Sequence, residues 1–305
     1  MANTQDASQV NSSGEDLAGQ RLGRRYLLGR RLGQGAAGVV YSARSLAPAL
    51  ATHGVARVAV KVVSPAFSSD AEVVARFIHE AFLGTRLAHP GILRVLDYGR
   101  AREGRAYHVT PLLRGATLAR LLSETGSLRP LVVASLVEDA ASALTYLHEH
   151  GLVHRDVKPS NLFVVVRPGE WPSLRVLDLG ICAVFDRKKA AALGVQDAGP
   201  GGRYGSPITF APEQALGLPL DGRVDVYALA CIAYRMLTGR DPFREPTIER
   251  LVHAHLFAEP PPPSSLSSRA PAAVDPVLLR GLAKRPDERY PSAIAFSEAL
   301  SSALR

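Results

Sequence analysis

The sequence predicts an α+β fold, because strand patterns gather in the first third of the chain and helical patterns dominate the remainder. Apolar ends around a glycine-rich turn predict two strands within residues 26–41, and a valine-rich run predicts another at residues 58–63. Apolar residues at helical spacing predict a helix within residues 70–88 and a longer one at 130–150. With 305 residues, 47% of them hydrophobic, the chain can bury a large core in one long domain or two lobes.

Composition excludes several classes of protein. Two cysteines, Cys182 and Cys231, are too few for a disulfide framework or a metal cluster, so we expect reduced thiols in a cytoplasmic protein. No apolar run approaches the roughly 20 residues of a membrane span. The first 20 residues are polar and mildly acidic, unlike a signal peptide, and we expect a disordered leader over residues 1–25.

The net charge of +8 raises the question of nucleic acid, with 36 basic against 28 acidic side chains. The arginines are scattered rather than clustered, and no nucleic-acid-binding motif is visible. A basic surface or an environment for phosphate groups explains the charge better. We therefore expect no nucleic-acid partner and no membrane partner.

The most informative stretch is the polar run at residues 152–161, which lies between apolar segments. His154 and Arg155 precede Asp156, and Lys158 and Asn161 follow it at fixed spacing. Phosphoryl transfer from a metal-bound nucleotide needs such a set: a carboxylate that orients the attacking hydroxyl, an amide that holds a metal, and a cation that offsets phosphate charge. A chance polar loop is the alternative, which further motifs in the right order would exclude.

A glycine triplet, Gly33, Gly35 and Gly38, lies between the first two predicted strands. Glycines let a backbone approach phosphates closely and present N–H groups to them. A dinucleotide-binding turn has the same glycine spacing, but it opens a helix, whereas Val40 and Tyr41 here continue as a strand. The triplet therefore favours a phosphate-binding hairpin.

Lys61 lies inside a continuous apolar strand, where an unpaired ammonium is costly. Glu80, on the helix predicted within residues 70–88, is the acid best placed to pair with it. The alternative, in which both are solvated surface charges, stays open at this point.

Further motifs follow in order: Asp178-Leu179-Gly180 after an apolar strand, Gly205 to Gln214 with its Ala-Pro-Glu, and the late run 282–290. Together with the stretches above, they make residues 26–303 resemble the catalytic domain of bacterial eukaryotic-type (Hanks-type) serine/threonine protein kinases. The resemblance implies a two-lobed protein-kinase fold: a small antiparallel sheet with one helix over residues 26–112, and a larger, mainly helical lobe over residues 113–305.

The resemblance also implies residue roles and cofactors, ATP with Mg²⁺ or alternatively Mn²⁺. Asp156, Lys158, Lys61 and Glu80 would be catalytic, and Asn161 and Asp178 would hold the metal. Nucleotide contacts would come from Leu32, Gly33, Gln34, Gly35, Gly38, Val40, Ala59, Lys61, Thr110, Pro111 and Leu113. Structural or regulatory roles would fall to His154, Arg155, Leu179, Gly180, Ser206, Glu213, Asp225 and Arg289.

Three of these implied roles carry further detail. The resemblance pairs Arg289 with Glu213 in a buried ion pair. Asp225 would brace the catalytic loop, although a helix N-cap is a compatible interpretation. Lys158 and Ser206 favour a serine or threonine acceptor on a protein substrate.

The chain departs from the family pattern at two places. Gly84, one turn after Glu80, stands where the family has a larger apolar residue, and a glycine within a helix costs about 1 kcal/mol relative to alanine. We therefore expect a loosely held helix that an activating partner or a homodimer contact seats. Residues 181–203, in the place of the activation segment, contain no serine or threonine, so we expect activity independent of phosphorylation there. The alternative function is a nucleotide-binding, pseudokinase-like signalling scaffold.

Overall fold

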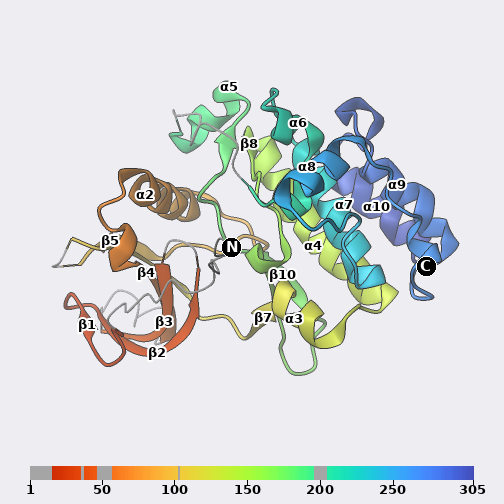
Figure 1. The fold of residues 1–305 in the computed structure, drawn as a ribbon. Helices are drawn as coiled ribbons and strands as arrows, with labels where there is room; N and C mark the ends of the chain where they lie inside the picture. The colour runs from red at the N-terminus through yellow and green to blue at the C-terminus, as the bar shows by residue number, and fades with distance from the viewer. Residues whose placement is uncertain (1–15, 36–37, 47–56, 102–103, 196–204) are drawn as a thin grey trace, which may run out of the picture. The chain divides into compact units, whose positions relative to one another are not determined.

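The computed structural model describes residues 16–35, 38–46, 57–101, 104–195 and 205–305 (Figure 1). The chain divides into two compact units: unit 1 comprises residues 1–81 and 95–112, and unit 2 comprises residues 82–94 and 113–305. The division between Leu112 and Leu113 falls where the sequence predicts the lobe boundary. Residues 82–94, expected in the first lobe, belong to unit 2 because Leu83, Leu87 and Ile92 pack into its core.

Unit 1 is built on an antiparallel sheet with strand order β1-β2-β3-β4-β6-β5. Its strands are β1 (Arg21–Leu22), β2 (Tyr26–Gln34), β3 (Gly38–Ser45), β4 (Arg57–Val63), β5 (Asp97–Arg100) and β6 (Ala106–Pro111). Helix α2 (Ala71–Arg86) begins in this unit, where its Phe77 packs with Val63 and Ala106. The sheet thereby fixes the strand that carries Lys61 and the helix that carries Glu80.

The expectation of a disordered leader over residues 1–25 is wrong for its last part; residues 1–15 lie outside the described residues. β1 pairs with β2, and Leu17 and Leu22 are buried in a core cluster with Tyr26 and Leu28. The backbone N–H of Leu17 donates to the hydroxyl of Tyr41. Burial of these apolar side chains stabilises the folded segment, and the overall polar composition of the segment hides this contribution.

Unit 2 is mainly helical. Its helices are α3 (Leu118–Thr125), α4 (Pro130–Glu149), α5 (Arg187–Ala190), α6 (Pro212–Leu216), α7 (Arg223–Thr238), α8 (Ile248–Phe257), α9 (Asp275–Gly281) and α10 (Ala293–Ala303). β7 (Gly115–Thr117), β9 (Leu162–Val165) and β10 (Ser173–Val176) form one small sheet, and β8 (Leu152–Val153) pairs with β11 (Ala183–Val184). The candidate catalytic loop, residues 154–161 of the polar run, therefore lies between the strands β8 and β9.

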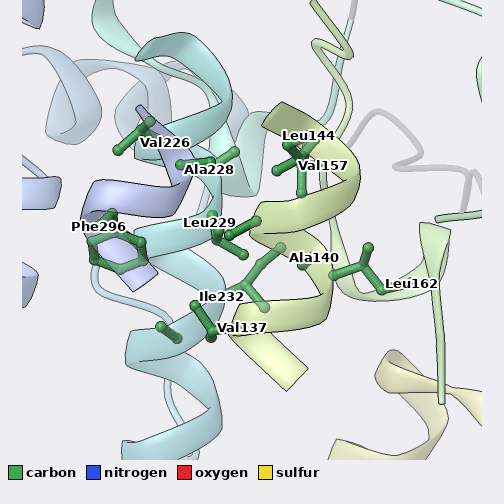
Figure 2. Packing of buried hydrophobic residues seen from close by; sticks show 14 of the residues in the cluster. Val137, Ala140, Leu144, Val157, Leu162, Val226, Ala228, Leu229, Ile232 and Phe296 are labelled. Carbon is green, nitrogen blue, oxygen red and sulfur yellow. The ribbon is translucent and has the colours of Figure 1, made fainter. Parts of the chain in front are cut away.

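The core of unit 2 lies among α4, α7 and α10 (Figure 2). Val137 and Leu144 from α4 pack near Leu229 and Ile232 from α7, with Phe296 from α10 beside them. All five side chains are buried. Burial of this kind supplies the main favourable term for folding, so the core fixes the loops that leave it.

Helix α4 corrects the expectation that no apolar run approaches membrane-span length. Its 20 residues are apolar enough to cross a membrane by length and composition alone. Eight of them are nevertheless buried within unit 2, and core helices of soluble proteins pass the same test. The structure accounts for α4 as a core helix.

The ion pair expected between Arg289 and Glu213 is present in unit 2. The guanidinium binds the carboxylate in a bidentate manner, with Nη1–Oε1 and Nη2–Oε2 distances of 2.7 and 2.8 Å. Both side chains are buried, and the guanidinium also donates to the carbonyl oxygens of Ala283, Arg223 and Lys284. Each buried charge thus has the partners that it needs.

Removing one partner of this pair should be strongly destabilising. Glu213→Gln leaves the Arg289 guanidinium buried without a countercharge, and we expect a loss of roughly 3–5 kcal/mol in the unfolding free energy of unit 2. Denaturant unfolding measures this loss. Arg285→Ala, which breaks an exposed ion pair with Asp287, is the control and should change little. Equal effects of the two substitutions would contradict the prediction.

Candidate active site

The glycine-rich hairpin of unit 1 joins β2 to β3, and Gly35 N–H donates to the carbonyl oxygen of Gly38. At Gly38 a Cβ would collide with the carbonyl oxygen of Val62, so the strand pairing itself requires glycine there. At Gly33 a Cβ would meet no described atom within 4 Å, and at Gly35 only one at 4.0 Å. The absence of side chains at Gly33 and Gly35 therefore keeps space open along the hairpin. Residues 36 and 37 of the turn lie outside the described residues.

Lys61 and Glu80 form the buried ion pair that the sequence left open, with Nζ 2.6 Å from Oε2. Burial alone would raise the pKa of Glu80, but Lys61 and His108 outweigh it and lower the pKa to about 2. Phe77 lies beside the pair, with the Lys61 ammonium 5.5 Å from its ring centroid. The glutamate therefore stays ionised and holds the ammonium at a fixed place in unit 1.

The residues expected around adenine lie along β3, β4 and β6. Val40 pairs with Lys61, and Ala59 pairs with Thr110, so these positions are neighbours across the sheet. Thr110 is buried at the end of β6, and Pro111, the last residue of that strand, pairs with Val58. Leu113 follows in unit 2, and Leu32 and Gln34 are exposed residues of β2. Their contact with a nucleotide remains a prediction.

The backbone of the catalytic-loop candidate is held from two sides. Arg155 has a φ of 66°, an uncommon conformation for a residue other than glycine. The fully buried Asp225 accepts the N–H groups of His154 and Arg155 at 2.8 and 3.0 Å and faces His148 Nε2 at 2.8 Å. On the other side, Gln214 Nε2 donates to the Arg155 carbonyl oxygen at 2.7 Å. These bonds hold the strained residue in place.

Asp225 is thus a brace and does not cap its helix. It is the third residue of α7, and Gly222 occupies the N-cap position without a side-chain hydrogen bond. The pKa of Asp225 is lowered although burial raises it, because His148 and the loop amides stabilise the carboxylate.

The carboxylate of Asp156 is held by one oxygen. Its Oδ2 accepts from Lys158 Nζ at 2.6 Å and from Asn161 Nδ2 at 3.0 Å. Its Oδ1 is buried and, among the described residues, has no hydrogen-bond partner. Burial raises the pKa of Asp156, against the opposing effects of Lys158 and His154, and Asp178 raises it further. The geometry leaves one acceptor oxygen ready for a donor.

Asn161 and Asp178 lie next to each other, since the N–H of Leu177 donates to the Asn161 carbonyl oxygen. The Asn161 amide group donates through Nδ2 to the backbone and side chain of Asp156, so its Oδ1 is the atom left to ligate a metal. Asp178 accepts the N–H of Gly180 at Oδ1. One carboxylate and one amide oxygen fit a hard cation such as Mg²⁺. Clusters of three or more His, Cys, Asp or Glu side chains that could hold a metal are absent from the described ranges.

The other expected residues lie near this loop or beneath it. Leu179 is buried, and Gly180 follows it. Arg155 Nε donates to the carbonyl oxygen of Ile181, at the start of the expected activation segment. Ser206 accepts a hydrogen bond from Thr209 N–H through its carbonyl oxygen. Residues 196–204 lie outside the described residues, so the phosphorylation expectation stays a prediction.

Sequence reasoning missed two residues that support the loop, His148 and Gln214. Each contacts a partner that is distant in sequence, Asp225 for His148 and Arg155 for Gln214. Helical spacing indicates which residues of α4 face the core but does not identify the partner of a histidine near its end. The position of Gln214 directly after Ala-Pro-Glu was the available signal for that residue.

Comparison with known proteins shows which family and which relatives the chain resembles. The family described as "Protein kinase domain" matches residues 26–295. The chain is 39% identical over 290 residues to the serine/threonine-protein kinase Pkn1 of Myxococcus xanthus, covering 95% of this chain and 40% of that protein. It is 36% identical over 280 residues to the serine/threonine-protein kinase PknD of Mycobacterium tuberculosis, covering 92% and 40% of the two chains. The chain therefore spans less than half the length of these relatives.

A solved structure gives a similar result. The kinase domain of Mycobacterium tuberculosis PknI, in its C20A_R136A double mutant, aligns with a TM-score of 0.70 and 28% identity. The alignment covers 95% of this chain and all of that one.

The lowered pKa of Glu80 predicts how acid affects stability. Because the folded-state pKa lies near 2, below the ordinary 4.5, the ionised pair contributes stability above about pH 4.5 that is lost as pH falls toward 2. Wild type should therefore exceed Glu80→Gln in stability near neutral pH, and the difference should shrink on acidification. Unfolding curves from about pH 6 to about pH 3 measure this.

The exposed Glu72 on the same helix provides the control, because Glu72→Gln should not alter the acid dependence. A stability difference between wild type and Glu80→Gln that stays constant with pH would refute the prediction.

Proposed function

The chain belongs to the protein kinase domain family, and we propose that it is an ATP-dependent serine/threonine protein kinase. It would transfer the γ-phosphate of ATP to serine or threonine hydroxyls of proteins. The names of its relatives support the choice of acceptor, as do Lys158 and Ser206 at their places in the sequence.

The observation that carries the proposal is the free acceptor oxygen of Asp156. Lys158 and Asn161 hold Oδ2, and Oδ1 is buried with no partner among the described residues. A substrate hydroxyl fits this oxygen as a donor, so Asp156 would orient the hydroxyl and accept its proton as the bond to phosphorus forms. The raised pKa of Asp156 makes its carboxylate a better base than an exposed aspartate.

Asn161 and Asp178 would hold Mg²⁺, or Mn²⁺ in its place, through Oδ1 of the amide and the carboxylate. A bound divalent cation offsets the negative charge of the nucleotide phosphates. The ammonium of Lys158, which already contacts Asp156, would add positive charge at the same place in unit 2.

Unit 1 would bind the nucleotide. Lys61, held by Glu80, would contact the α- and β-phosphates, and the open space along Gly33 and Gly35 leaves room for phosphates beside the hairpin backbone. Thr110 and the backbone of Pro111 and Leu113 would contact adenine; Pro111 lacks an N–H and offers only its carbonyl oxygen.

The scaffold alternative has no support. Lys61 and Glu80 are paired, and Asp156, Asn161 and Asp178 are present in an arrangement that can work on a hydroxyl and a metal. The proposed partner is a protein that carries a serine or threonine acceptor, in signal transduction, with no need for nucleic acid or a membrane. The proposed location is the cytoplasm, where buried cysteine thiols such as those of Cys182 and Cys231 stay reduced.

A second proposal concerns regulation. An activating partner, or a second copy of the chain, would seat the helix that carries Glu80, because Gly84 adds no side chain where α2 is buried. The support is this glycine within a 16-residue helix that must keep Glu80 at Lys61.

Phosphate transfer from labelled Mg-ATP tests the main proposal. The purified chain should label itself or a generic basic protein, and Asp156→Asn should lower the rate by at least roughly a hundredfold, since an amide cannot accept the hydroxyl proton. The control is Asp186→Asn, which changes an aspartate that caps the short helix α5.

Transfer that persists in Asp156→Asn would remove this residue from the mechanism. An absence of transfer in wild type, together with a rise in melting temperature on nucleotide addition, would favour the scaffold alternative or a missing activator that acts on the Gly84 helix.

Filling the helix at Gly84 tests the regulatory proposal. Wild-type activity per molecule should rise with protein concentration or with an added partner, and Gly84→Leu should reduce this dependence because it stiffens the helix and adds an apolar group. Ala75→Leu adds the same side chain at an exposed position of α2 and is the control. If the dilute monomer is fully active and Gly84→Leu does not change that activity, the regulatory proposal is wrong.

A further inference from the structure

His108 faces the ion pair of unit 1 from the neighbouring strand. It lies directly opposite Lys61 in the antiparallel pairing of β6 with β4, so both side chains project from the same face of the sheet. Glu80 meets both of them from α2: its Oε2 lies 2.6 Å from Lys61 Nζ, and its Oε1 lies 3.4 Å from His108 Nε2. The Glu80 carboxylate is thus contacted by side chains from two neighbouring strands, Lys61 on β4 and His108 on β6.

The ring of His108 is almost completely buried. Its side chain is 5% exposed, that of Glu80 is 7% exposed, and the ring packs on Phe77 with centroids 4.9 Å apart. Neither ring nitrogen has a well-aligned hydrogen bond to any part of the chain that the structure describes. The acidic group that contacts the ring is the carboxylate of Glu80.

A buried imidazole without good hydrogen bonds costs stability, and an aliphatic side chain would suit this strand position better. The favourable contact that His108 makes in return is with Glu80, where a charge or N–H on Nε2 stabilises the carboxylate. A carboxylate held by one oxygen can still turn about its last side-chain bond, because that torsion is broad. A second contact on the other oxygen restricts the turn.

We propose that His108 is a positioning residue that fixes the Glu80 carboxylate from the side opposite Lys61, so that Lys61 stays aligned for the nucleotide phosphates. The proposal rests on the kinase function proposed above. It gives α2 an anchor inside unit 1, independent of any partner that acts near Gly84.

Three substitutions at His108 separate positioning from packing. His108→Leu keeps an apolar volume but loses the contact, and kcat/KM for ATP should fall roughly tenfold while thermal stability stays equal or rises. His108→Gln places an amide N–H near the position of Nε2 and should retain most of the activity. His108→Asn, whose amide lies nearer the position of Nδ1, should lose activity as the leucine variant does.

The Glu80→Gln background tests whether His108 acts through Glu80. There the cost of His108→Leu should largely vanish, because the carboxylate to be positioned is gone. A merely structural role would give parallel losses of stability and activity, with no rescue by glutamine.

The outcomes distinguish this inference from the proposed function. Wild type and Asp156→Asn are assayed beside the variants, and a wild type that is inactive at every protein concentration would overturn the kinase function itself. An active wild type with equal activity in the leucine, asparagine and glutamine variants would overturn the role of His108. If the leucine variant does not fold, the asparagine and glutamine pair decides: equal activities refute the role, and activity in glutamine alone supports it.

Discussion

The backbone of the candidate catalytic loop, residues 154–161, depends on one buried carboxylate. Asp225 accepts the N–H groups of His154 and Arg155 and faces His148, and Arg155 has a positive φ. Without that acceptor, the loop would have to leave buried N–H groups unpaired or relax toward an ordinary conformation. Because Asp156 directly follows Arg155, the hydrogen bonds that Asp225 accepts also help to fix the position of the Asp156 carboxylate.

Each unit uses a buried ion pair in a different way. Arg289 and Glu213 in unit 2 are bidentate and surrounded by carbonyl acceptors, which is a structural solution to buried charge. Lys61 and Glu80 in unit 1 are joined by a contact of 2.6 Å, and His108 adds a longer contact to the same carboxylate.

The sequence predicted much of the site because its chemistry is local. The spacing of Asp156, Lys158 and Asn161 within one loop is sufficient to bring their side chains together. Prediction from the sequence failed where burial decides the outcome. Residues 16–25 are ordered because Leu17 and Leu22 are buried, and α4 is apolar enough to resemble a membrane span. Residues 82–94 belong to unit 2 and not to the first lobe.

The sequence by itself determined which chemical groups are available, their order along the chain, and the strands and helices that carry them. It also indicated that Lys61 needs a partner, since an ammonium in an apolar strand is costly. Only the tertiary structure decided the distant pairings: Asp225 with His154 and His148, Gln214 with Arg155, and His108 with Glu80. These contacts join residues far apart in the chain, and their partners follow from core packing and strand register, which no local spacing encodes.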